Sequence, residues 1–275
     1  MTPAHVHPAP FGAGVVGPVV AVAVLLVAAA YLLAAARLRH RGDRWPWPRD
    51  VSFTAGSAAV LWAVVGSLPG EPFTAHSAQH LTVAMAAPLL LVLARPLTLA
   101  LRALPPCRAR RALLAVLHAR PAQWLMFPPL AALLDVGGLW ALYRTPLFAA
   151  ADEPVVHALV QAHTLAAGLL FTFAVCQLDP VRRRWGTALR GATLLAAGAA
   201  HAVLAKSLYA TPPPGTAFTT ADLRTGAQLM YYGGDLVEVG LALTLAVRWY
   251  VAGNRLAAGR GLALPRRGVV QTAKE

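Results

Sequence analysis

The chain has 275 residues, of which 57% are apolar and only 13% are charged. Soluble domains carry charge on about a quarter of their residues, so this composition excludes an ordinary soluble domain and indicates a membrane protein. The net charge of +13 would by itself suit a nucleic-acid-binding protein, so the placement of the basic residues has to decide between the two.

Seven apolar runs are long enough to cross the ~30 Å hydrocarbon layer, which takes about 20 helical residues. They are Gly14–Ala36, Val51–Leu68, Phe73–Ala94, Pro121–Tyr143, Val155–Leu178, Gly191–Tyr209 and Leu229–Val251. The sequence therefore predicts an all-α fold, a polytopic membrane bundle of seven transmembrane helices over residues 14–251. A short N-terminal tail (1–13) and a basic C-terminal tail (252–275) flank it, with no room for a separate soluble domain.

The basic residues gather in alternate connections. All but three of the 24 lysines and arginines lie in four segments, 37–49, 95–120, 182–190 and 248–274. The positive-inside rule then places the N-terminus outside and the C-terminus in the cytoplasm. The positive charge is thus explained by membrane topology. We therefore expect the chain to interact with the lipid bilayer and not with nucleic acid. The segment 95–120 also suits a short helix along the cytoplasmic interface.

Ionisable residues interrupt the apolar runs, and in this topology they all fall in the outer half of the membrane. Such residues are costly in lipid and usually mark a functional site that faces the bundle interior. Histidines at similar depth on several helices favour a metal site. The candidate ligands are His76, His80, His157, His163 and His201.

The histidine spacing carries part of this hypothesis. His76 and His80 are four residues apart, so they share one helix face, as two ligands of one ion often do. His163 lies about 120° around the helix axis from His157, so one straight helix cannot aim both at one point. Which of the two is a ligand stays open. His201 lies near the midplane, where no interface explains a polar side chain.

Other polar residues suit a supporting role around such a site. Asp235, Glu238 and Tyr231 share a face of the last run, and a carboxylate commonly orients a metal-bound imidazole. The remaining candidates for second-shell or cation-binding groups are Gln79, Gln161 and Asp135. Met85 and Met230 are possible thioether ligands for copper(I), although methionines in apolar helices usually serve packing.

Several motifs occur together in order: His76-Ser-Ala-Gln79-His80, Ala87-Pro88, Arg95-Pro96, His157 and His163 before Ala167-Gly168, Asp179-Pro180, His201-Ala202 and Gly234-Asp235. Over residues 50–250 or so, the chain resembles the CtaG-like cytochrome c oxidase assembly proteins, multi-pass membrane proteins of bacteria.

The resemblance implies an assembly factor for a haem-copper oxidase in the bacterial cell (inner) membrane, not an enzyme, whose partners are oxidase subunits. It implies a role at copper insertion, so copper is the expected cofactor and the five histidines named above are its candidate ligands. Two alternatives use the same residues. One is a membrane b-type cytochrome with axial histidines holding haem, and the other is a cation- or proton-coupled transporter.

Overall fold

The structure is a computed structural model that describes residues 16–66 and 68–261, and these residues form helices and no strand. The elements are α1 (Val16–His40), α2 (Trp47–Val65), α3 (Pro72–His80), η1 (Leu81–Ala86), α4 (Ala87–Leu93), α5 (Pro96–Ala103), α6 (Arg108–His118), α7 (Arg120–Leu125), α8 (Pro128–Arg144), α9 (Leu147–Ala150), α10 (Pro154–Cys176), α11 (Thr187–Ala210) and α12 (Thr220–Gly261). The predicted all-α class is confirmed. The tail 1–13 and most of the tail 252–275 lie outside the described residues.

Five helical segments are long and apolar enough to cross a membrane. They are Gly17–His40, Pro72–Ala103, Pro154–Cys176, Thr187–Ala210 and Thr220–Asn254. The other two predicted spans correspond to α2, which carries Arg49 and Asp50 near its start, and to α8, which has only 17 residues. Helices therefore occupy all seven predicted positions, and five of them have both the length and the composition of a span.

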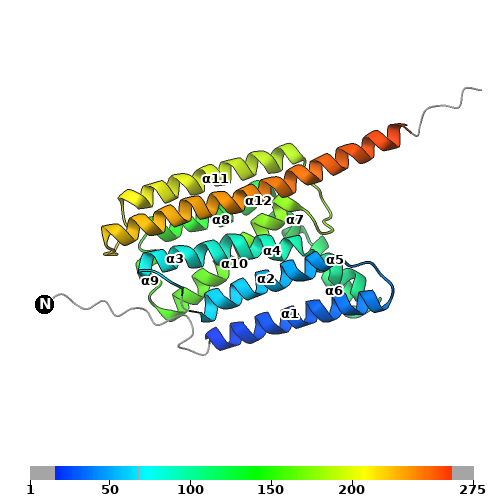
Figure 1. Ribbon diagram of the computed structural model, residues 1–275, viewed down its shortest axis with the longest axis horizontal. Coiled ribbons are helices and arrows are strands. Elements are labelled where there is room, and N and C mark those ends of the chain that lie inside the picture. The colour runs from blue at the N-terminus through cyan, green and yellow to red at the C-terminus, as the bar shows by residue number, and fades with distance from the viewer. Residues whose placement is uncertain (1–15, 67, 262–275) are drawn as a thin grey trace, which may run out of the picture.

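The long helices lie side by side along one axis (Figure 1). α12 packs against α11 and α3, and α2 packs against α4 and α1. α10 packs against α8, η1 and α4, so η1 lies between α2, α10 and α12 in the interior of the bundle. The short helices α5, α6 and α7 gather at one end of the bundle, and α9 lies at the other (Figure 1).

Prolines begin helices more often than they kink them. Seven helices have proline at their first or second position: α2, α3, α4, α5, α7, α8 and α10. The predicted run Pro121–Tyr143 is wrong at its start, because α7 ends at Leu125, Phe127 is extended, and Pro128 begins a separate α8. The cause is local: a residue before proline is disfavoured in the α region.

The helix that carries His76 and His80 changes its winding directly after His80. Residues Leu81–Ala86 form a π-helix, in which the Ala87 amide donates to the Thr82 carbonyl. Pro88 follows and has no amide hydrogen to donate. Gly168 of α10 lies so close that a Cβ there would overlap the Ala84 carbonyl oxygen. The glycine thus allows α10 to approach the backbone of η1, as small residues do between membrane helices.

Two aspartates from distant segments cap helices that lack a cap of their own. Asp222 accepts hydrogen bonds from the amides of Phe73 (2.8 Å) and Thr74 (2.9 Å) at the start of α3. Asp179 does the same for α5, accepting from the amide (2.8 Å) and the hydroxyl (2.5 Å) of Thr98. These contacts fix the start of α12 to α3, and the segment after α10 to α5.

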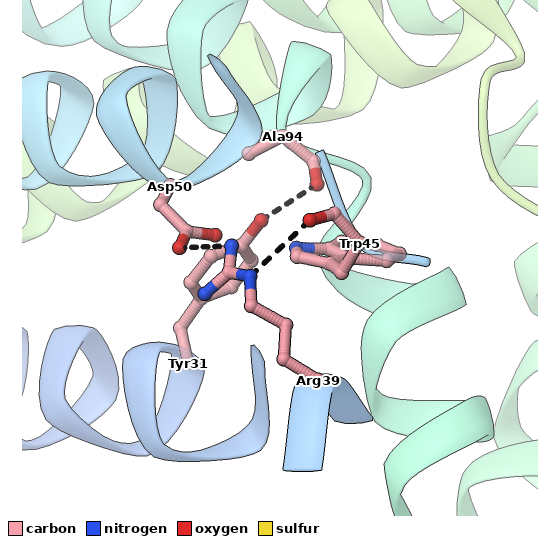
Figure 2. Close-up of polar contacts among 5 residues, drawn as sticks. All are labelled: Tyr31, Arg39, Trp45, Asp50 and Ala94. Carbon is pink, nitrogen blue, oxygen red and sulfur yellow. Dashed lines mark hydrogen bonds and ion pairs between the residues drawn. The ribbon is translucent and has the colours of Figure 1, made fainter. Parts of the chain in front are cut away.

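A further polar network joins α1 to α2 and α4 (Figure 2). Arg39 donates to the Asp50 carboxylate at 2.6 Å and to the Trp45 carbonyl at 3.3 Å. The Tyr31 hydroxyl donates to the Ala94 carbonyl at 2.9 Å, and the Tyr31 ring stacks on Phe53 at 3.9 Å. Asp50 is buried, so its charge is matched by Arg39 instead of by water.

Candidate functional site

A small cavity of about 30 Å³ lies inside the bundle, where η1, α8, α10, α11 and α12 meet. The polar and sulfur-bearing side chains on its wall are His80, Met85, Asp135, Thr172, His201 and Glu238, and the rest of the wall is apolar. One water needs roughly 10–15 Å³ of such space, so the cavity has room for about two waters or a single ion.

His80 of α3 and His201 of α11 lie next to each other, with their ring centroids 6.1 Å apart. Both are buried, and the Nε2 atom of each has no hydrogen-bond partner among the described residues. Buried polar atoms are normally satisfied, so a pair of such atoms beside one cavity calls for an explanation. Two imidazoles this close would repel if both were protonated, which favours neutral rings with free lone pairs.

Glu238 lies beside His201, near its Nδ1 atom. Its Oε1 atom is 3.6 Å from Nδ1 of His201, within ion-pair range but longer than a hydrogen bond. Asp235, one turn earlier on α12, interacts electrostatically with both side chains. Two glycines make this possible, because a Cβ on Gly198 would overlap the Glu238 carboxylate and one on Gly234 would overlap the His201 ring.

His76 and His157 lie outside the cavity, toward the start of their helices. The His76 ring packs edge-on against Tyr143 (5.7 Å) and Phe148 (4.7 Å). Nδ1 of His157 lies 3.3 Å from the Ala151 carbonyl. His76 precedes His80 by one helical turn on α3, and His157 lies in the first turn of α10.

His163 faces a different part of the bundle. Its Nε2 atom lies 3.2 Å from the Leu134 carbonyl of α8, against Gly138, and its side chain is exposed. The two glutamines pair with each other, since Gln161 donates to Gln79 at 2.9 Å and Gln79 donates to the Ala63 carbonyl of α2. This pair ties α10 to α3 and α2 and lies apart from the cavity.

Tyr231 and Met230 also lie away from the cavity. The Tyr231 ring lies 5.1 Å from the Lys206 ammonium, in a surface concavity between α11 and α12. Met230 is fully buried in an apolar cluster, whereas Met85 lines the cavity. In the described part of the chain, no group of three or more His, Cys, Asp or Glu residues converges as a metal-binding cluster. The structure thus brings His80 and His201 together and distributes the other histidines around them.

Sequence reasoning missed the residues that shape the site. Gly198 precedes His201 by one helical turn, and that i, i+3 spacing is the signal that could have identified it. The π-helix after His80 has a weaker signal, Pro88, because a proline inside an apolar run is equally typical of a simple kink. The Asp222 cap has no signal of its own, because its partners are almost 150 residues away (|i−j| 148–149).

Comparisons with known proteins agree with this reading of the chain. The family model described as cytochrome c oxidase caa3 assembly factor matches residues 29–252. An uncharacterized protein of Mycobacterium bovis is 36% identical over 173 residues, 58% of this chain and 26% of that protein. An uncharacterized protein of Mycobacterium leprae is 28% identical over 252 residues, 82% of this chain and 38% of that protein.

The chain therefore spans about a quarter to two fifths of the length of these relatives. No solved structure gives a significant match. The family match covers most of the chain and includes the segments that carry His80, His201 and Glu238. The resemblance drawn from the motifs is confirmed, and the chain belongs to the family of cytochrome c oxidase caa3 assembly factors.

Proposed function

We propose that the protein is a non-enzymatic factor that holds copper(I) in the His80–His201 cavity and delivers it during assembly of a haem-copper oxidase. The observation that carries this proposal is the pair of buried Nε2 atoms, on His80 and His201, that lack partners beside one ion-sized cavity. Copper is the cargo here, and oxidase subunits are the partners that receive it.

The donor set suits copper(I). Imidazole binds copper well, and the soft thioether of Met85 on the same cavity wall is typical of copper(I). A carboxylate near the second ring nitrogen keeps a ligating imidazole in the right tautomer, and Glu238 holds that position for His201. Asp135 lies on the same wall, and its carboxylate would offset the cation when ionised.

His157 and His76 give the cargo a route. Both stand near the starts of their helices, and His76 is one turn before His80, so an ion could reach His80 by exchanging one imidazole for the next. In the topology proposed below, this route begins at the outer face. The route assigns His157, and not His163, to the metal path.

The proposed topology is seven spans in a bacterial inner membrane, with the N-terminus outside. The alternation of basic segments supports it. With 17 residues, α8 is at the lower limit of a spanning helix, and it packs between α10 and α11, both of which qualify as spans. Arg49 and Asp50 stand at the end of α2 nearest the basic segment 37–49, where charge is tolerated.

The haem alternative requires much more space than this site offers. Cofactor pockets usually measure about 300–1,000 Å³, whereas the cavity between His80 and His201 measures about 30 Å³. A transporter using Asp235 and Glu238 would not depend on His80. Copper loading therefore separates the proposed function from both alternatives.

The test is copper binding by the purified protein in detergent under reducing conditions. We expect one copper per chain by elemental analysis, and loss of that copper in His80→Ala and in His201→Ala. His118→Ala, on α6, is the matched control and should bind as the wild type does. Wild-type copper content in both cavity variants would refute the proposed site.

The assembly role needs its own measurement. Deletion of the gene should lower cytochrome c oxidase activity and the copper content of the oxidase, while His201→Ala should fail to restore them. Normal oxidase in the deletion strain would contradict a role in assembly, whatever the copper content of the purified protein.

A further inference from the structure

His163 is an exposed imidazole in the middle of a membrane-spanning helix. It lies nine residues after the start of α10, which corresponds to about 14 Å along the axis. Hydrocarbon offers no hydrogen-bond partner at such a depth, so polar side chains there almost always face protein or a wet cavity. An exposed histidine on this surface therefore calls for a wet groove or for another molecule that covers it.

The hydrogen bond of His163 fixes what that molecule must offer. Nε2 lies 3.2 Å from the Leu134 carbonyl, and a carbonyl only accepts, so the ring proton sits on Nε2. In this tautomer Nδ1 carries a free lone pair. No hydrogen bond from another described residue reaches Nδ1, so the covering molecule should bring a donor.

A groove of about 490 Å³ surrounds this imidazole between α8 and α10. Its wall is mostly apolar and includes Leu142, Leu147, Val156 and Leu159. His80 and Asp135 line both the groove and the inner cavity. The groove thus runs from the lipid-facing surface to the wall of the proposed copper site.

We infer that this groove, called the α8–α10 groove below, is the docking surface for a transmembrane helix of an oxidase subunit, with a side-chain donor of that helix bonded to Nδ1 of His163. A lipid acyl chain could fill the apolar part of the groove but has no donor at this depth. A helix seated here lies next to His80, so the cargo would reach its recipient without crossing lipid. The inference rests on the proposed assembly function.

The experiment is photo-crosslinking in membranes of cells that make the oxidase. A benzoylphenylalanine replaces Leu159, which is 66% exposed in the groove, and in the control it replaces Leu236, which is 75% exposed on α12. We expect an adduct from position 159 with a transmembrane segment of an oxidase subunit, identified by peptide mass spectrometry, and none from position 236.

His163 supplies the specific readout. Removing one hydrogen bond between membrane helices should lower the adduct yield roughly three- to tenfold in His163→Leu. His163→Gln, whose amide can still accept and donate, should restore part of the yield. Both variants should keep the copper content of the wild type, which also shows that they fold.

Four results would overturn the inference: equal adducts from both positions, adducts with lipid only, adducts with a second copy of this chain only, or an unchanged yield in His163→Leu. Failure of copper binding in the wild type, with the adduct and its His163 dependence intact, would instead refute the copper proposal and support the docking surface. The two hypotheses therefore fail in different ways.

Discussion

The histidines of this chain differ in what surrounds them more than in where they stand in the sequence. His76 and His80 share a helix face, as their spacing predicts, but His76 packs against aromatic rings and His80 lines the cavity. Helical spacing fixes the direction of a side chain and says nothing about which neighbours stand opposite it. Those neighbours come from α8, α9, α11 and α12, and no local pattern encodes their position.

Asp222 is a single residue whose loss should weaken the whole bundle. Asp222→Ala removes the acceptor for two amides and for the Thr74 hydroxyl at the start of α3. The loss of such a cap costs about 1–2 kcal/mol, so we expect a thermal unfolding midpoint several degrees below that of the wild type in detergent.

The exposed Asp152 provides the control for this measurement, since Asp152→Ala removes a carboxylate that caps no helix. Equal midpoints for the two variants would show that the Asp222 contacts do not stabilise the fold.

Asp179 should give the protein a characteristic dependence on pH. Burial raises the pKa of Asp179 above its ordinary value, and the hydrogen bonds from Thr98 oppose this only in part. Because the folded state then holds the proton more tightly than the unfolded state, the contribution of Asp179 to stability is full below the unfolded pKa and is lost as the pH rises through the folded pKa.

Asp179→Asn should remove that dependence. The asparagine oxygen can still accept from Thr98, and its amide stands where the protonated oxygen would be. We expect the difference in thermal midpoint between Asp179→Asn and wild type to grow in favour of the variant as the pH rises above about 4. A difference that stays constant with pH would contradict the raised pKa.

At the level of the elements, the sequence located helices well and their ends less well. Hydropathy placed α1, α10 and α11 to within four residues at each end. It failed at α7 and α8, where Pro121 and Pro128 each begin a helix although the residues between them are apolar apart from Gln123. α12 starts nine residues before its predicted start. The segment Thr220–Gln228 is helical although it contains polar residues, because Asp222 binds the start of α3 and this part of α12 packs on α3.

The contact between α10 and η1 should tolerate no side chain at Gly168. In Gly168→Ala the new Cβ would overlap the Ala84 carbonyl oxygen, which is backbone and cannot turn aside. The helices would have to separate beside the cavity, so we expect a strongly destabilised protein with reduced copper binding and poor yield.

Gly253→Ala is the matched control, because nothing lies within 4 Å of a Cβ at that position of α12. Alanine also favours helix over glycine by about 1 kcal/mol, so this variant should be as stable as the wild type or slightly more so. Similar thermal midpoints for both glycine variants would show that the Gly168 contact is not tight.

For the whole molecule, charge placement carries more information than hydropathy does. Among the described residues, five helices have both the length and the composition of a span, whereas α2 and α8 lack one or the other. The alternation of basic segments favours seven, because α5, α6 and α7 then share a side with residues 37–49. The cavity itself was beyond sequence reasoning, because it depends on how closely α11 and α12 approach at Gly198 and Gly234.

Cysteine labelling in intact cells can test this topology. Cys107 lies in the connection between α5 and α6 and is partly exposed, whereas Cys176 is buried. A membrane-impermeant maleimide should therefore label the native protein in inverted vesicles and leave it unlabelled in intact cells. An added cysteine at Ala217, in a Cys107→Ser background, should show the opposite pattern. Labelling of Cys107 in intact cells would reverse the proposed orientation.

The position of Glu238 on α12 determines when, during synthesis, the wall of the cavity can be completed. Domains are synthesised from the N-terminus at about 5–20 residues per second, so His80 and His201 both enter the membrane before α12 exists. The cavity wall is closed by α12, whose start is fixed to α3 through Asp222. A chain made only as far as α11 consequently has both imidazoles and no enclosure, and the cavity can close only once α12 has been made.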